Sequence, residues 1–443
     1  MESTYDIVVV GGGFAGAIAA RELSHRGYRS IVLEARDRPG GRTWLRSNAI
    51  RDRSLEMGGT WIDPRQTQSW AEAQAYGIRI GEPVFGAPPR TWLIGGNRST
   101  GPFPVSVRGL GHLERLIRHF GNDASRIDAS RPLNEQSVVD LDIPLTEYVS
   151  GTGAPPDLAA AATAYLSMYG SAPPEDISAL HLLRRMSAAG SFAEFVMSGA
   201  SHPLVEGTDA LLSAIVKDGD AQVVLSSPVD RIVQTQTGVS VFTSDRAFRC
   251  RCAVLTVPVN TWKQITFEPA LSSAKRRLSE EELACQGFKV WLLVRGVPPG
   301  FSACGDGTPF GLVWTEEVFD DGAALLVAYG NDAAETDIAD PHQLQIALRA
   351  FIPEAELLEH CGHDWRRDRW SLETWPVFKP SQITRYEEAL RAPEGRVLIA
   401  GTATALRWPG FIDGAIESGK CAAEEADRLL REERSDTVFG EDR

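Results

Sequence analysis

The sequence lacks the features of several large protein classes. Its six cysteines are spread over 443 residues, which is no disulfide framework, so we expect free thiols in a reducing compartment. No uncharged apolar run reaches the roughly 18 residues of a membrane span. Acidic residues outnumber basic ones, 59 against 45, and the net charge of −14 argues against nucleic acid or an anionic membrane as partner. A strand that begins at Tyr5 leaves no room for a signal peptide, so we expect a cytoplasmic protein.

Metal-ligand patterns are missing as well. Cys250 and Cys252 have the alternating spacing of a strand, and no second cysteine pair stands near them. The residues from His360 to Asp364 have a spacing that fits no zinc template, and we interpret them as a loop. We therefore predict that the protein has no metal site.

What the sequence does contain is a dinucleotide-binding fingerprint near its start. A β-branched run at residues 5–10 leads into the glycine-rich segment 11–16, and an alanine-rich helical stretch follows. A second strand at residues 30–33 then ends at Glu34. Strand, G-x-G-x-x-G, helix, strand and acid in one βαβ unit predict a site for a dinucleotide.

Each residue of the fingerprint has a physical task. Gly11 allows the tight turn, Gly13 lets a pyrophosphate approach the backbone, and Gly16 lets the helix pack close to the strand. The start of the helix offers free N–H groups and the positive end of its dipole to the phosphates. Glu34 is placed to accept hydrogen bonds from ribose hydroxyls.

Two further glycine blocks follow the fingerprint, at residues 34–43 (EARDRPGGRT) and 55–62 (LEMGGTWI). The two glycines before Arg42 suit a second close approach to a pyrophosphate. Together with the fingerprint, these blocks resemble the flavin-containing amine oxidases, which include monoamine oxidase, polyamine oxidase, L-amino-acid oxidase and the bacterial nicotine oxidoreductases. The resemblance implies FAD as the cofactor, because a plain NAD enzyme is not expected to carry the second and third blocks.

The resemblance also implies the fold. We expect a doubly wound, Rossmann-type FAD-binding domain made of residues 1–78, 204–286 and 385–431, as in monoamine oxidase. An interleaved α+β substrate-binding domain would take residues 79–203 and 287–384, and residues 432–443 would form a disordered tail. Apolar spacing predicts four helices in the first substrate segment, at residues 107–119, 137–149, 158–169 and 180–186.

Matching the family motifs residue by residue gives the implied cofactor site. In the family, a backbone valine contacts adenine, and Val229 stands at its place. A helix that starts near Ile412 would face the flavin N1–C2=O edge and stabilise negative charge there. The family usually has glutamate where this chain has Ala403. The implied FAD-binding residues are Gly11, Gly13, Phe14, Ala15, Gly16, Glu34, Ala35, Arg36, Gly41, Arg42, Gly58, Gly59, Thr60, Trp61, Val229, Trp365, Gly401, Thr402, Phe411 and Ile412.

Three residues are implied for catalysis. A lysine at the place of Lys289 hydrogen-bonds through water to the flavin N5 in the family; the alternative is an edge strand with this lysine in solvent. Two parallel rings flank the flavin of monoamine oxidase, and Trp375 and Phe411 match their positions. The alternative for Trp375 is a place in the interface between the domains.

The flavin linkage follows from one missing cysteine. Monoamine oxidase bonds its flavin covalently to a cysteine whose place here is Thr374, and no cysteine lies between Cys361 and Cys421. The resemblance, corrected for this departure, implies non-covalent FAD.

The implied function is oxidation of an amine. A hydride or its equivalent leaves the carbon next to nitrogen for the flavin, the imine hydrolyses to a carbonyl compound, and O2 or another acceptor takes the electrons. Residues 164–170 (AYLSMYG) and 252–271 are similar to the nicotine or pseudooxynicotine type, which favours an aromatic, heteroaromatic or cyclic amine. The alternatives are an L-amino-acid or polyamine oxidase, a flavin desaturase, and a binding protein without flavin that resembles the GDP-dissociation inhibitor. A homodimer is possible.

Overall fold

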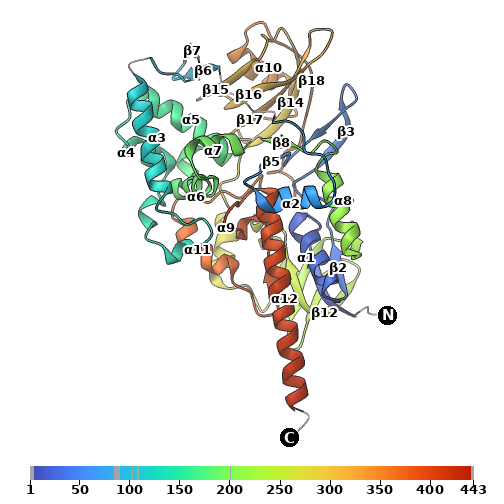
Figure 1. The fold of residues 1–443 in the computed structure, drawn as a ribbon. Coiled ribbons are helices and arrows are strands. Elements are labelled where there is room, and N and C mark those ends of the chain that lie inside the picture. Colours follow the sequence, from blue (N-terminus) through green and yellow to red (C-terminus); the bar gives the residue numbers. More distant parts are fainter. Residues whose placement is uncertain (1–3, 84–89, 102, 107–108, 200, 441–443) are drawn as a thin grey trace.

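The computed structural model describes residues 4–83, 90–101, 103–106, 109–199 and 201–440. Its larger sheet has the strand order β13-β10-β11-β12-β1-β2-β9, and β19 pairs with β12 (Figure 1). These strands are β1 (Thr4–Val10), β2 (Ser30–Leu33), β9 (Gln222–Val224), β10 (Val229–Gln234), β11 (Val239–Thr243), β12 (Ala247–Leu255), β13 (Thr266–Glu268) and β19 (Val397–Ile399).

The centre of this sheet is parallel. β1 lies between β2 and β12, and Val9 pairs with Val32 on one side and Val254 on the other. All three valines are buried, which explains the continuous β-branched runs, because a parallel strand is covered on both faces. The predicted doubly wound nucleotide-binding architecture is confirmed here, whereas the exact domain boundaries stay a prediction.

Helix α1 (Phe14–His25), which follows β1, packs against two helices from later in the chain. These are α8 (Thr208–Gly219) and α12 (Ile412–Gly440). The contact between α1 and α12 needs a small residue, since a Cβ added to Gly419 would lie 2.5 Å from the Ala15 carbonyl oxygen. Gly419 therefore lets α12 pack closely on α1.

The smaller sheet has the order β18-β14-β17-β16-β15-β6-β7 and lies at the opposite end of the molecule from the C-terminus (Figure 1). Two short antiparallel pairs, the hairpin β3-β4 and the long-range pair β5-β8, complete the described strands. Their bounds are β3 (Leu45–Ile50), β4 (Arg53–Glu56), β5 (Trp61–Ile62), β6 (Thr91–Ile94), β7 (Asn97–Thr100), β8 (His202–Pro203), β14 (Phe288–Arg295), β15 (Ser302–Gly305), β16 (Leu312–Val318), β17 (Ala324–Gly330) and β18 (Glu356–Gly362).

A helical layer flanks the two sheets, and it corrects one predicted helix. The segment 137–149 forms only a 3-10 turn at Val139–Leu141 before α4 begins after Pro144. Proline disfavours the helical conformation of the residue that precedes it, so one continuous helix cannot run through this position. The helix predicted from residue 107 begins at Leu110; residues 107 and 108 lie outside the described residues. The helices are α2 (Thr67–Ala75), α3 (Leu110–Ala124), α4 (Leu145–Gly151), α5 (Pro156–Gly170), α6 (Ala179–Ala189), α7 (Phe192–Ser198), α9 (Ser273–Glu281), α10 (Pro341–Phe351) and α11 (Gln382–Arg391), with further 3-10 turns at Leu133–Glu135, Pro174–Asp176, Val259–Gln264 and Thr402–Thr404.

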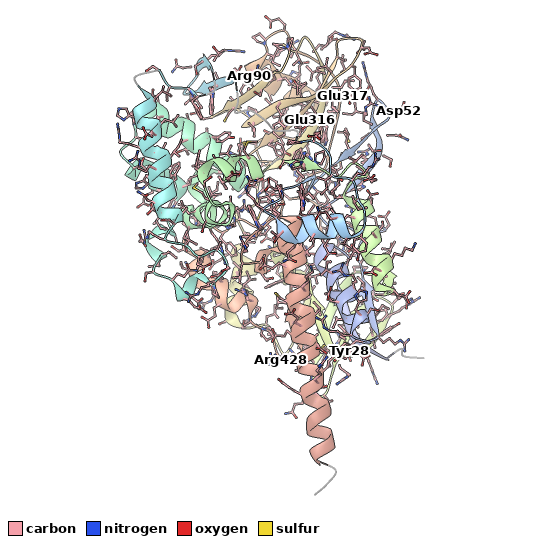
Figure 2. The ribbon with its side chains drawn as sticks, viewed as in Figure 1. Tyr28, Asp52, Arg90, Glu316, Glu317 and Arg428 are labelled. Carbon is pink, nitrogen blue, oxygen red and sulfur yellow. The ribbon has the colours of Figure 1, made fainter. Side chains whose placement is uncertain are left out.

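The predicted disordered tail is wrong for residues 432–440, which continue α12 (Figure 1). Glu433 accepts hydrogen bonds from Arg251 and Arg396, which hold this part of α12 against the larger sheet. Tyr28 donates to Asp427 one and a half turns earlier (Figure 2). Residues 441–443 lie outside the described residues. Within the described part of the chain, no helix combines the length and apolarity of a membrane span.

Candidate active site

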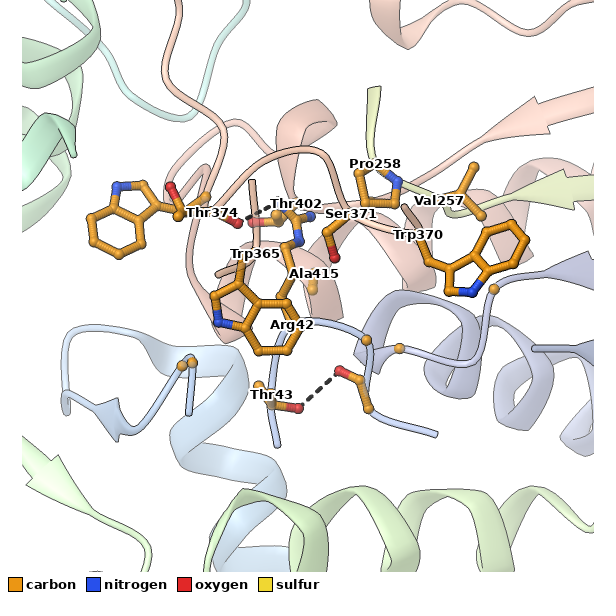
Figure 3. Close-up of a pocket in the computed structure, with 18 of the residues that line it drawn as sticks. Arg42, Thr43, Val257, Pro258, Trp365, Trp370, Ser371, Thr374, Thr402 and Ala415 are labelled. Carbon is orange, nitrogen blue, oxygen red and sulfur yellow. Dashed lines mark hydrogen bonds between the residues drawn. The ribbon is translucent and has the colours of Figure 1, made fainter. Parts of the chain in front are cut away.

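One cavity of about 750 Å³ is lined by residues that follow strands of the larger sheet and by residues of the smaller sheet. Figure 3 draws part of its wall. Every residue predicted for the cofactor and for catalysis lines this cavity, with the exception of Gly16. Segments separated by hundreds of residues meet in its wall, from Val10 to Ala415. The predicted residues are therefore brought together, although their individual roles stay predictions.

The turn between β1 and α1 forms one end of the cavity. Gly11 has a φ of +108°, which favours glycine, and a Cβ on Gly16 would lie 2.0 Å from the Gly11 carbonyl oxygen. Gly16 thus serves the packing of helix on turn, which explains its absence from the wall. A Cβ on Gly13 would meet nothing nearer than 3.8 Å, so this position has open space beside it.

Glu34 is buried at the end of β2 and faces the same turn. Its two carboxylate oxygens accept hydrogen bonds from the backbone N–H groups of Gly12, at 2.7 Å, and Arg36, at 2.8 Å. A carboxylate has about four acceptor sites, so lone pairs remain for a further donor in the cavity. Holding the glycine turn is a second task of Glu34 that the sequence did not reveal.

The basic side chains near the turn have acidic partners, of which Glu373 is fully buried and Asp368 partly buried. Arg36 donates to Asp368 at 2.8 Å, and Arg42 donates to Glu373 at 2.5 Å. Arg42 also donates to the Thr374 carbonyl oxygen at 2.9 Å (Figure 3). Neither acid was predicted, although both stand within ten residues of Trp365. These ion pairs fix the loop after β18 against the block at residues 34–43.

Trp365 closes the middle of the cavity. Its indole is buried and donates to the Met57 carbonyl oxygen at 3.0 Å, so it also fixes the block at residues 55–62. The Arg38 guanidinium lies over the Trp365 ring at 5.9 Å, and burial lowers the pKa of Arg38 to about 10. Figure 3 draws Trp365 and Arg42 among the residues of the wall.

Lys289 projects into the cavity from β14, a central strand between β17 and β18. The edge-strand alternative is therefore wrong. Its ammonium donates to the Thr60 hydroxyl at 2.6 Å and lies 4.8 Å from the ring centres of Trp61 and Trp291. Burial lowers its pKa to about 7, against the opposing charges of Glu56 and Glu316. Glu316 stands among the strands of the smaller sheet (Figure 2).

Trp375 and Phe411 both line the cavity, on two different loops. Gly410 brings these loops together: its φ is +93°, and an added Cβ would lie 3.4 Å from the Trp375 side chain. The Thr402 hydroxyl accepts from the Gly410 N–H at 2.7 Å and donates to the Phe411 carbonyl oxygen at 3.0 Å. The ring position is thus set by backbone contacts, just before α12 begins.

Sequence reasoning missed part of the wall at this end. Tyr169, Trp314 and Tyr329 add three rings, and Trp314 stacks on Tyr329 with ring centres 5.5 Å apart. Arg185, which is 1% exposed, also belongs to the wall. The motif at residues 164–170 was a signal for Tyr169, whereas nothing in the local sequence marked Arg185.

Comparison with known proteins agrees with this geometry. Residues 14–426 match the family described as flavin containing amine oxidoreductase. The chain belongs to this family. The predicted enzyme class is thereby confirmed, and the interpretation as a binding protein without flavin is set aside.

Several relatives of this amine oxidoreductase act on nicotine-type compounds according to their names. A pseudooxynicotine dehydrogenase of Pseudomonas sp is 33% identical over 94% of this chain and 85% of the relative. The (S)-6-hydroxynicotine oxidase of Paenarthrobacter nicotinovorans is 31% identical over 94% of this chain and 98% of the relative. Among solved structures, a putrescine oxidase triple mutant has a TM-score of 0.85 at 22% identity and covers 97% of this chain and 99% of its own. At that identity the likeness shows the fold alone.

The residues of the cavity fit the flavin that the family requires. Gly13 faces open space at the start of α1, Glu34 has spare acceptor sites, and Arg36 and Arg42 stand beside the turn. Asp413 in the first turn of α12 is turned toward Ser69, whose N–H it accepts at 2.8 Å. The first N–H groups of α12 are therefore left for a ligand beside Ile412, which lines the cavity.

Proposed function

We propose that this amine oxidoreductase oxidises an aromatic, heteroaromatic or cyclic amine of the nicotine or pseudooxynicotine type. The observation that carries the proposal is the substrate end of the cavity, where five rings form the wall. Such a lining favours a flat, largely apolar substrate that fits between rings. The printed names of the relatives support the same class. The five rings are Tyr169, Trp314, Tyr329, Trp375 and Phe411.

The cofactor end has a separate task. We assign the pyrophosphate to the turn at Gly13, the ribose to Glu34 and the adenine to Val229, each of which lines the cavity. When bound, the flavin supplies the acceptor for two electrons from the carbon next to the amine nitrogen. The chain contributes orientation through Trp375 and Phe411, and a hydrogen-bonding ammonium at Lys289. The imine product is then hydrolysed to a carbonyl compound.

The flavin is bound without a covalent link in this proposal. Thr374 stands at the place of the linking cysteine, and within the described residues no cysteine lines the cavity. Denaturation with acid or heat should release all the flavin into the supernatant. Flavin that stays with the precipitated polypeptide would contradict the proposal.

A substrate panel under anaerobic conditions tests the amine class. Within the described residues the carboxylates of the wall are Glu34, directly after β2, and Asp230, on β10, so the substrate end has none for a polyamine. We expect aryl-alkyl and heteroaromatic amines to bleach the yellow flavin faster than spermidine, putrescine or L-amino acids. Faster bleaching by a polyamine or an amino acid would refute the assignment.

The electron acceptor is open to direct measurement. The relatives are named both oxidases and dehydrogenases. We propose O2 with release of H2O2, and stopped-flow mixing of the reduced enzyme with oxygenated buffer tests this. Reoxidation slower than turnover would point to another acceptor. The homodimer and the cytoplasmic location stay predictions.

A further inference from the structure

Arg185 is a buried cation in the wall of the substrate end, and it has no acidic partner. Its side chain projects from α6, is 1% exposed and lines the cavity. Within the described part of the chain, no carboxylate stands at ion-pair distance from it, whereas its neighbour Arg184 pairs with Glu387 at 2.5 Å. An unneutralised buried charge is costly, so its retention calls for a purpose.

The guanidinium joins three segments of the wall by hydrogen bonds to carbonyl oxygens. One Nη donates to Tyr169 at 2.6 Å, and the other donates to Pro409 at 3.0 Å and Pro376 at 3.4 Å. Pro376 follows Trp375, and Pro409 comes two residues before Phe411. The same guanidinium lies over the Phe411 ring at 5.3 Å. Arg185 therefore fixes the carbonyls beside three of the rings.

These bonds leave the positive charge in place, because carbonyl oxygens are neutral acceptors. Burial lowers the pKa of Arg185 to about 9, which still leaves it charged at neutral pH. On its own helix, burial and the two arginines lower the pKa of His181 far below its usual range, so this histidine adds no charge. Cys285, from the segment after α9, is also near, and burial raises the pKa of its thiol.

We propose that Arg185 determines substrate specificity: its unneutralised charge makes the ring-walled pocket take amines in their uncharged form and reject a cationic centre. This rests on the proposed function and deepens it. Two charges of one sign in a dry site repel strongly, and the ring faces of Trp375 and Phe411 offset only part of that repulsion. An uncharged nitrogen keeps the lone pair that an amine needs in order to become an imine. A diamine would add a second cation and is disfavoured further.

The test uses two probes of one shape, phenyltrimethylammonium and tert-butylbenzene, bound to the flavin-loaded protein. Neither is oxidised, so the measurement does not depend on turnover. Absorbance changes of the flavin and shifts in melting temperature give the two dissociation constants. We expect wild type to bind the neutral probe at least about tenfold more tightly, which corresponds to about 1.4 kcal/mol.

Three variants separate charge from positioning. Arg185→Met and Arg185→Gln should each reduce the neutral-to-cation preference at least about tenfold. Arg185→Lys keeps the charge but replaces the planar guanidinium fork by a compact ammonium that does not reproduce the spacing of the three contacts, so it should weaken both probes while their ratio stays high. The control is the double variant Arg184→Met/Glu387→Gln, which removes the neutralised pair between Arg184 on the same helix and Glu387 on α11, and it should leave the ratio unchanged.

The outcomes decide the proposal in either direction. Wild type that binds the cation as tightly as the neutral probe overturns it without any variant. An unchanged ratio in whichever of Arg185→Met and Arg185→Gln retains its flavin and melting transition also overturns it. Failure of the proposed function would instead leave the flavin yellow with every aryl-alkyl amine while the probe ratio stays as expected.

Discussion

The two ends of the cavity are constructed in different ways. At the cofactor end, the stretch from residue 11 to residue 61 supplies turns, backbone N–H groups and the ion-paired arginines, and later segments at Val229 and Ile412 add to it. At the substrate end, each ring comes from a different element, and α5, β16, β17 and two loops contribute one each. A site of backbone groups allows few sequences, whereas a site of side chains on separate elements can change one residue at a time. The comparison explains why one family keeps its cofactor and varies its amine.

The substitution Gly13→Val should break the cofactor end most completely. We expect flavin affinity to fall at least about 1,000-fold, because the side chain would occupy the space of the pyrophosphate. The chain should still fold, since nothing lies within 3.8 Å of the added Cβ. The absorbance of the flavin at about 450 nm, divided by that of the protein at about 280 nm, measures the loading.

The control for this variant is Gly121→Val in α3, where an added Cβ also meets nothing within 4 Å. It should load flavin as wild type does. Full occupancy in Gly13→Val would show that the phosphates bind elsewhere.

Glu34→Ala should have the next largest effect. It removes the acceptor for ribose and leaves the N–H groups of Gly12 and Arg36 without their partner. Such losses cost about 1–3 kcal/mol each, so we expect flavin binding to weaken about 100-fold. Equilibrium dialysis against FAD measures this, and Glu34→Gln, which keeps one acceptor oxygen, should recover part of the affinity. Equal affinity in Glu34→Ala and wild type would remove this residue from the site.

Lys289 lies where the cofactor end and the substrate end of the cavity meet. The substitution Lys289→Met should leave flavin loading unchanged. We expect the reaction of reduced enzyme with O2 to slow about 10- to 100-fold, as for the loss of one stabilising donor at a reacting group. The pKa of Lys289 is about 7. Its charged form dominates below that pH, so the wild-type rate should fall as the pH rises through about 7, and the variant should lose this dependence. Stopped-flow traces at several pH values measure both effects; identical half-reactions would make the lysine purely structural.

Trp375→Ala should have the smallest effect and should act at the substrate end alone. We expect KM for the best aryl-alkyl amine to rise about 2- to 30-fold, from the loss of about 0.5–2 kcal/mol of ring contact. Trp370→Ala is the matched variant, because this ring lines the cavity in the loop whose Asp368 and Ser371 bind Arg36. It should lower flavin loading and leave KM unchanged in the loaded fraction. A raised KM in Trp370→Ala together with lowered flavin loading in Trp375→Ala would place Trp370 at the substrate end and Trp375 at the cofactor end.

The same contrast decides what could be predicted from the sequence. The nucleotide-binding fold and the residues of the glycine turn followed from local patterns, because a glycine turn and its strand are neighbours in the chain. The other cofactor residues came from the resemblance to the amine oxidases and their roles stay predictions. Arg185 could not be predicted, since its three carbonyl partners stand 16, 191 and 224 residues away. The disorder predicted from residue 432 rested on polar composition, whereas α12 runs to Gly440. That composition gave no sign of the hydrogen bond between Glu433 and Arg251, which stands 182 residues earlier.

The wide separation of the lining segments has a consequence during biosynthesis. The wall runs from Val10 to Ala415, and its last part includes Gly401 and the start of α12. A nascent chain on the ribosome presents the glycine turn early, yet the wall of the pocket is incomplete until Gly401 and the start of α12 have been synthesised. Insertion of the cofactor is thus a late event in the life of the polypeptide, and the partly synthesised chain must stay soluble with an empty nucleotide fold until then.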